Sequence, residues 1–234
     1  QALSVKVLHL ANSPFYGLSG RVRSIRDAIN ILGMRQLSSL VIAAALTLQF
    51  EKLHGQSLHM NAFWRHSIGC ATAARQLAKR TGLDEQAAFT AGLLHDVGKI
   101  GIPDSILLKG GSLTPAELQV MQTHPVLGTE IVTGNPWLQE AAVIIRHHHE
   151  RLDGKGYPDG LRGEEIPLIA RIFAVVDVFD ALTSERSYKS PMGLDEAMQI
   201  ILHESGSHFD PRIATAFMDI APALYVTITR AETN

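Results

Sequence analysis

Hydrophobic residues recur at helical intervals along almost the whole chain. Leu3, Val7 and Leu10 are spaced to lie on one face of a helix, and this pattern stops at the breaker residues 12–14. The same spacing predicts further helices over 24–32, 37–50, 61–80, 85–95 and 114–122, from about 125, and over 138–150, 166–182, 194–204 and 211–221. We therefore expect an all-α fold in which the helices pack as a bundle.

Local sequence signals agree with these helices. Asp84 is placed to cap the helix that follows it, and Thr114 and Glu117 form a capping-box pattern. One segment leaves an alternative open, because 169–178 is rich in Ile and Val and would also suit a buried strand. Its length and the helical patterns on both sides favour a buried helix.

A polar stretch over 51–57 interrupts the apolar pattern and contains Gly55. We place a domain boundary there, with an N-terminal helical segment over 1–55 and a larger domain over 56–234. The first residue already lies within an apolar periodic segment. We therefore expect the sequence to be a fragment of a longer protein.

Composition narrows the class of protein. The 234 residues are 46% hydrophobic with a formal net charge of −2, so the chain can bury a core and lacks the positive charge that general binding to DNA or RNA needs. The single cysteine, Cys70, cannot form an internal disulfide and is expected to pack in the core. No signal-peptide pattern is present, and the apolar run 37–50 is too short to cross a bilayer. We expect a cytoplasmic protein without membrane association.

Candidate metal donors occur in five clusters along the chain. Successive clusters lie 24 to 29 residues apart, which is about one helix plus its connection. Each cluster would therefore sit on a different helix or helix end, and such side chains can converge inside a bundle. The donors are His66, His95, Asp96, His124, His148, His149 and Asp177.

This donor set indicates two adjacent metal ions, because it exceeds what one tetrahedral zinc site needs, and Asp96 would bridge them. Imidazole and carboxylate donors favour iron or manganese, with zinc and nickel also acceptable. Two such ions can activate water and hold the oxygens of a phosphoryl group, which indicates hydrolysis of a phosphate ester. Lys99 follows Asp96 by three residues and would share its helical face, where it can neutralise a phosphate oxygen. The alternative for Lys99 is an exposed surface lysine.

The donors also have ordinary explanations when taken singly. A helical histidine such as His66 or His124 is usually hydrogen-bonded to protein groups, and 147–149 would suit the C-terminal end of a helix. Asp177 is harder to explain without a cation, because it lies within the apolar run 172–179. A buried carboxylate is costly when it has no partner.

Three longer motifs resemble one known family. The stretches 95–99 (HDVGK), 148–158 (HHERLDGKGYP) and 177–189 (DVFDALTSERSYK) are similar, in the same order, to motifs of the HD-GYP subgroup of HD phosphohydrolases. The resemblance covers roughly residues 58–220. It implies an all-helical domain with a two- or three-metal centre that hydrolyses cyclic dinucleotides, chiefly cyclic di-GMP.

The resemblance implies roles for the donors and their neighbours. The seven donors match the family's metal ligands, Lys99 matches its catalytic-site lysine beside Asp96, and His147 is a bystander. Family members with three metals carry a glutamate one turn before the first histidine. Ala62 stands at that position, so we expect two metals.

Further positions match the family's substrate contacts. Arg186 and Lys189 correspond to basic residues that hold the phosphates of the ligand. Glu150 and Asp153 would orient histidines or brace the neighbouring loop. That loop carries the GYP signature, which implies contact with the substrate and with a signalling partner, and it consists of Gly156, Tyr157 and Pro158.

Residues 1–55 resemble the closing part of an HDOD domain, a helical regulatory module, through the stretches 7–17 and 25–33. Together the resemblances imply a phosphodiesterase that converts cyclic di-GMP to the linear dinucleotide and on to GMP. Three alternatives stay open: an enzyme that prefers 3′3′-cyclic GMP-AMP, a nucleoside-phosphate hydrolase of the wider HD group, and a non-catalytic scaffold that binds the nucleotide. We expect a homodimer.

Overall fold

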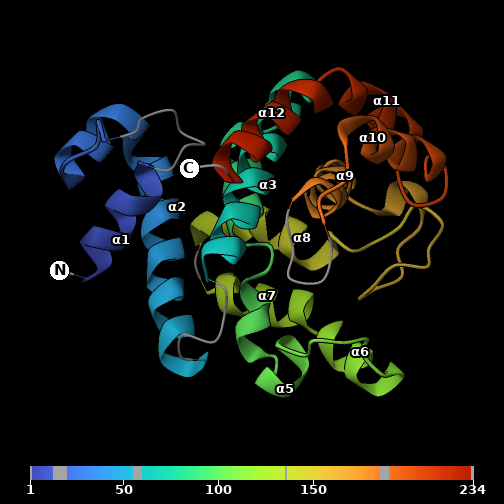
Figure 1. Ribbon diagram of the computed structural model, residues 1–234, viewed down its shortest axis with the longest axis horizontal. Coiled ribbons are helices and arrows are strands. Elements are labelled where there is room, and N and C mark those ends of the chain that lie inside the picture. Colours follow the sequence, from blue (N-terminus) through green and yellow to red (C-terminus); the bar gives the residue numbers. More distant parts are fainter. Residues whose placement is uncertain (1, 13–19, 55–59, 135, 185–189, 233–234) are drawn as a thin grey trace.

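Every regular element of the computed structural model is helical (Figure 1). The structure describes residues 2–12, 20–54, 60–134, 136–184 and 190–232, and no β-strand occurs in these ranges, so the expected all-α fold is confirmed. The α-helices are α1 (Ala2–Ala11), α2 (Ile25–His54), α3 (Met60–Thr81), α4 (Glu85–Leu94), α5 (Asp104–Leu107), α6 (Pro115–Met121), α7 (His124–Thr133), α8 (Gln139–His147), α9 (Leu168–Thr183), α10 (Leu194–His203), α11 (Pro211–Met218) and α12 (Ala221–Glu232). The 3₁₀ helices are η3 (Val97–Gly101), η4 (Pro136–Leu138) and η5 (Gly163–Glu165).

The N-terminal helices α1 and α2 pack against each other at one side of the molecule (Figure 1). Helix α2 is interrupted at Gly33, whose φ of 80° and ψ of 164° are not helical, so the expected helix end at this glycine is confirmed. The later part of α2 packs on α4, where the hydroxyls of Ser39 and Thr90 hydrogen-bond at 2.7 Å in a buried contact. The predicted domain boundary at 51–57 falls partly on 55–59, outside the described residues.

One stretch of α2, Ile25–Leu46, has the length and mean hydropathy of a membrane span. Core helices and signal sequences meet the same criterion, and 33% of this stretch is buried inside the molecule. The interruption at Gly33 divides it into two helical pieces.

Helix α9 lies at the centre of the helices from α3 onward and is surrounded by several of them (Figure 1). Its side chains are buried on most of its circumference, as a helix with neighbours all round requires. The helical interpretation of 169–178 is therefore confirmed. Helices α3 and α4 approach closely because Gly92 has no side chain: a Cβ there would lie 2.5 Å from Cα of Ala71.

Two segments differ from the sequence prediction. We expected one final helix over 211–221, but α11 ends at Met218 and a further helix, α12, begins at Ala221. Pro222 lies in the first turn of α12, where a backbone N–H would have no helical partner. The sequence predicts a helix over 85–95, and Lys99 would share the helical face of Asp96 only if this helix persisted for one more turn. It ends before His95, and Lys99 lies in η3 instead.

Candidate metal centre

Three of the predicted donor histidines stand at helix ends. His95 directly follows α4, His148 directly follows α8, and His124 begins α7 shortly after α6 ends. The last carbonyls of a helix lack a partner within the helix, so a following histidine can bond to one of them. Nδ1 of each ring lies 2.8 Å from the carbonyl oxygen three residues earlier, on Gly92, Ile145 and Met121 respectively. Because Nδ1 donates to this oxygen, Nε2 carries no proton when the ring is neutral and is free to bind a metal.

His66, on α3, is oriented by a carboxylate instead. Its Nδ1 lies 2.5 Å from Oδ2 of Asp180 on α9, a residue that is only 2% exposed. Ser184 donates a hydrogen bond to the same oxygen at 3.2 Å. Asp180 is missing from the residues that the sequence singled out, although it follows Asp177 by three residues and so shares its helix face. Carboxylates commonly fix metal-binding histidines in this way.

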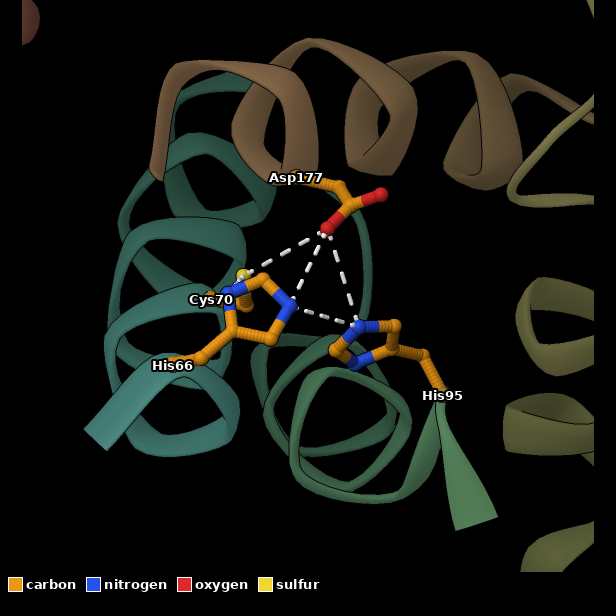
Figure 2. A group of neighbouring side chains, drawn as sticks. All are labelled: His66, Cys70, His95 and Asp177. Carbon is orange, nitrogen blue, oxygen red and sulfur yellow. Dashed lines mark hydrogen bonds and ion pairs between the residues drawn. The ribbon is translucent and has the colours of Figure 1, made fainter. Parts of the chain in front are cut away.

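The donors form two neighbouring groups. In the first, side chains from α3, α9 and the end of α4 point toward one another (Figure 2). Nε2 of His66 lies 3.1 Å from Nε2 of His95 and 3.3 Å from Oδ1 of Asp177. The second group consists of His124, His148 and His149. Nε2 of His124 lies 3.4 Å from Nε2 of His148.

Asp96 stands between the two groups. Its Oδ2 lies 3.4 Å from Nε2 of His95, and its Oδ1 lies 3.4 Å from Nε2 of His124. The structure therefore brings all seven predicted donors to one place. Lys99 belongs to the same cluster, because its Nζ donates to Oδ2 of Asp96 at 2.5 Å. The tight turn of η3 provides this contact in place of a continued α-helix.

Burial keeps most of the histidines neutral. It lowers the pKa of His124 and that of His148 to about 4, and it lowers the pKa of His149 well below the ordinary value. His66 is the exception. Burial alone would lower its pKa, but the carboxylates of Asp180 and Asp177 beside it raise the pKa well above 6.5.

The carboxylates of the centre stay ionised. Burial opposes the charge of Asp96, but Lys99 and the surrounding imidazoles hold its pKa well below the usual range. Burial acts in the same way on Asp177, whose pKa is held well below the usual range by its contact with His66. Ionised carboxylates and neutral imidazoles are the forms in which both groups bind metals.

Cys70 lies one helical turn after His66 and borders the first donor group (Figure 2). Its Sγ is 3.6 Å from Nδ1 of His66 and 4.0 Å from Oδ1 of Asp177. It is buried, as expected, and burial raises the pKa of its thiol to about 12. The sequence prediction placed Cys70 in the core but gave no sign that it would lie next to the donors.

The GYP signature lies in a loop that folds back on the end of α8. A Cβ at Gly156 would run into backbone atoms of residues 149–151, so only glycine fits there. The N–H of Tyr157 donates to the carbonyl oxygen of His149 at 3.3 Å, and the Tyr157 ring stacks on the His149 ring with centroids 4.7 Å apart. Pro158 follows through a cis peptide bond. The loop therefore borders the second donor group.

The remaining predicted residues have different places. Glu150 and Asp153 contact the loop rather than a donor histidine: Glu150 accepts hydrogen bonds from loop amides, and Asp153 bonds to Arg151. His147 turns away from the seven donors toward Asp159, with 3.4 Å between Nδ1 and Oδ2. Three further predicted positions, the residues Arg186 and Lys189 and the side chain of Ala62, lie outside the described part of the chain.

The donor atoms fit metal ions in their spacing and, except for His66, whose raised pKa means that it must lose a proton to bind, in their protonation. Nitrogen and oxygen ligands bind transition metals at about 2.0–2.2 Å, which puts neighbouring ligand atoms about 3.0–3.5 Å apart. The separations of 3.1 Å, 3.3 Å and 3.4 Å within the two groups match this range. The cluster can therefore hold divalent metal.

The sequence of this chain is similar to those of known proteins. A family model described as "HD domain" matches residues 37–213. The cyclic di-GMP phosphodiesterase response regulator RpfG of Xanthomonas campestris pv. campestris is 50% identical over 147 residues, which cover 61% of this chain and 39% of that protein. The 3′3′-cGAMP-specific phosphodiesterase 2 of Vibrio cholerae is 41% identical over 159 residues, which cover 66% of this chain and 30% of that protein.

A solved structure shares the fold. Bd1817, an HDG"Y"P protein from Bdellovibrio bacteriovorus, superposes with a TM-score of 0.59 at 18% identity, over 92% of this chain and 70% of that chain. This chain spans only 39% and 30% of the length of the two curated relatives. Because the family model matches most of its residues, the chain belongs to the HD domain family.

Proposed function

We propose that this chain is a metal-dependent phosphodiesterase that hydrolyses a cyclic dinucleotide, with cyclic di-GMP as its main substrate. The convergence of the seven predicted donors around Asp96 carries the proposal, because such a cluster suits phosphate ester hydrolysis. The names of the relatives support the substrate class, since both act on cyclic dinucleotides.

The donor set suits two divalent ions, with Asp96 shared between them. Iron or manganese fits a site made only of imidazole and carboxylate ligands. Bound there, such ions would supply positive charge that activates water and stabilises the phosphoryl group. One ion would be held by His66, His95 and Asp177, and the other by His124, His148 and His149.

The residues around the metal ligands would bind the substrate and its phosphates. Lys99 contacts Asp96, and this contact supports a role in which its ammonium would offset charge on a phosphate oxygen. Tyr157 borders the centre beside His149, where it would contact the substrate. Arg186 and Lys189, outside the described residues, would bind phosphate. A cyclic dinucleotide brings two phosphate charges to a chain whose own net charge is −2, so local cations are needed.

Turnover of cyclic di-GMP by the manganese-loaded protein tests this function, with the products separated by chromatography. We expect the linear dinucleotide to accumulate. Asp96→Ala should abolish turnover, because it removes the carboxylate that faces both donor groups and Lys99. Asp195→Ala, the same change at the exposed start of α10, should leave turnover unchanged. An intact cyclic substrate after incubation with metal-containing wild type would contradict the proposal.

A second substrate is favoured by one observation, the 41% identity to a 3′3′-cGAMP-specific enzyme. Parallel turnover of cyclic di-GMP and 3′3′-cyclic GMP-AMP decides between the two. Binding of either nucleotide without turnover would instead identify a scaffold.

A further inference from the structure

We propose that Glu150 is a positioning residue: its buried carboxylate holds the loop 151–162 in the shape that keeps Tyr157 over the second donor group. The proposal rests on the function proposed above, because it assigns this loop to the substrate side of the centre. Glu150 is 2% exposed and lies directly after His149.

Three consecutive backbone N–H groups converge on this one carboxylate. Oε1 accepts hydrogen bonds from the amides of Asp159 at 2.8 Å and Gly160 at 3.1 Å, and Oε2 accepts from Leu161 at 3.0 Å. Successive amides that point to one spot form an anion-binding nest. Here the chain fills the nest with its own anion, so the loop shape and the carboxylate depend on each other.

Glu150 is not the loop's only support, since the Tyr157 N–H also donates to the carbonyl oxygen of His149 and other contacts hold the loop elsewhere. Arg146 forms a two-pronged ion pair with Asp159, at 2.8 Å and 2.7 Å, but about a third of both side chains is exposed. Exposed pairs of this kind contribute little to stability. At the start of the loop, the amides of Leu152 and Asp153 donate to carbonyls of 207–208. Glu150 is therefore a buried carboxylate that supports residues 159–161 of the loop.

Tyr157 links the part of the loop held by Glu150 to the second donor group. The loop turns back so closely that Gly156 touches the backbone of 149–151, which leaves it little freedom to adjust. The Tyr157 ring lies nearly parallel to that of His149, at 29°, and 6.5 Å from that of His124. If the loop were released from Glu150, the Tyr157 ring would no longer cover the second donor group, although every donor atom would remain.

Glu150→Gln tests the proposal in the full chain. All three neighbours of the carboxylate are N–H donors, so the amide NH₂ of glutamine must face at least one of them in either orientation. Glu165→Gln is the matched control, because exposed Glu165 accepts a single loop amide, that of Arg162, at 2.9 Å. Should Glu150→Gln not fold, Glu150→Asp keeps the charge but is too short to reach all three amides.

Three measurements are made on each variant: hydrogen exchange of the loop amides, metal content, and kcat and KM for cyclic di-GMP. For Glu150→Gln we expect exchange at 159–161 to rise at least about tenfold, with α3 and α9 unchanged. Metal content should stay at the wild-type level. KM should rise about tenfold while kcat changes less than about threefold, because Tyr157 would contact the substrate without taking part in the reaction. Glu165→Gln should resemble wild type.

Unchanged exchange at 159–161 would overturn the proposal, as would loss of metal in step with activity, because Glu150 would then act on the donors. An unchanged KM with a mobile loop would overturn the substrate-side role. If wild type itself turns over no cyclic dinucleotide, the proposed function fails. The exchange measurement still decides whether Glu150 holds the loop.

Discussion

Four of the donor histidines have Nδ1 committed to a protein acceptor, which leaves Nε2 to meet the other donors. For three of them the acceptor is a helix carbonyl, and for His66 it is Asp180. The sequence predicts the donors because histidine and aspartate clusters recur at helix-length intervals. It does not reveal Asp180 or Cys70 as neighbours of the centre, because their contacts depend on how α3 and α9 pack together.

Asp180→Asn should weaken metal binding by about tenfold or more, because a neutral amide orients and polarises His66 less than a carboxylate does. Competition with a calibrated chelator measures the affinity. Asp195→Asn is the control, because Asp195 is exposed in the first turn of α10. Equal affinity in Asp180→Asn and wild type would show that His66 needs no such partner.

The metal-free protein should lose stability as the pH falls from about 6.5 to 4. Burial lowers the pKa of His124, His148 and His208 to about 4, whereas the unfolded chain takes up these protons near pH 6.5. Within this window the unfolded state binds more protons, so falling pH favours unfolding. The raised pKa of His66 contributes stability that is fully present below about pH 6.5, so this contribution stays constant as the pH falls through the window. Thermal unfolding at pH 7 and pH 5 checks this, and an unchanged midpoint would refute it.

At the scale of elements, most donors lie at or just after helix ends, whereas His66 and Asp177 lie within α3 and α9. Glycines let these elements approach one another. Helix positions are well predicted by the apolar pattern, and the cap at Asp84 and the capping box at Thr114 are both present. The helix predicted over 85–95 ends within one residue of the observed end of α4, but nothing local to the sequence shows that η3 follows it and packs on α7. That contact depends on Gly98: a Cβ there would overlap the backbone of His124 and Gly128.

Gly98→Ala should lower the free energy of unfolding by about 1–3 kcal/mol, because rigid backbone on α7 must move to admit the methyl group. It should also weaken metal binding, since η3 and α7 carry Lys99 and His124 and both would shift. Urea unfolding and chelator competition measure the two effects. The control is Gly110→Ala, where an added Cβ meets no atom within 4 Å. Similar behaviour of the two variants would refute the role of this contact.

At the scale of the whole molecule, sequence periodicity predicts the all-α class and most of the helices. It does not predict which helices pack into one core and unfold together. Helix α12 is missed because Pro222 resembles a helix stop, whereas it occupies the first turn. The predicted boundary at 51–57 stays a prediction. The HD domain match begins at residue 37, within α2, and this half of α2 packs on α4.

If α2 and α4 share one core, Ser39 and Thr90 should be energetically coupled through their buried hydrogen bond. Ser39→Ala leaves the Thr90 hydroxyl without this partner and should cost about 1–3 kcal/mol. Adding Thr90→Val should cost less than the sum of the single changes, by about 0.5 kcal/mol or more. Urea unfolding of the four proteins measures the coupling. Strict additivity would show that the two helices are not coupled there.

Metal stoichiometry tests the central claim most directly. Protein is titrated with manganese, freed of unbound ions and examined by elemental analysis beside Asp96→Ala. The seven donors predict two bound ions in wild type and fewer in the variant, because Asp96 lies between the groups. A folded wild type that retains no ion, or a variant that retains as many as wild type, would contradict the shared centre.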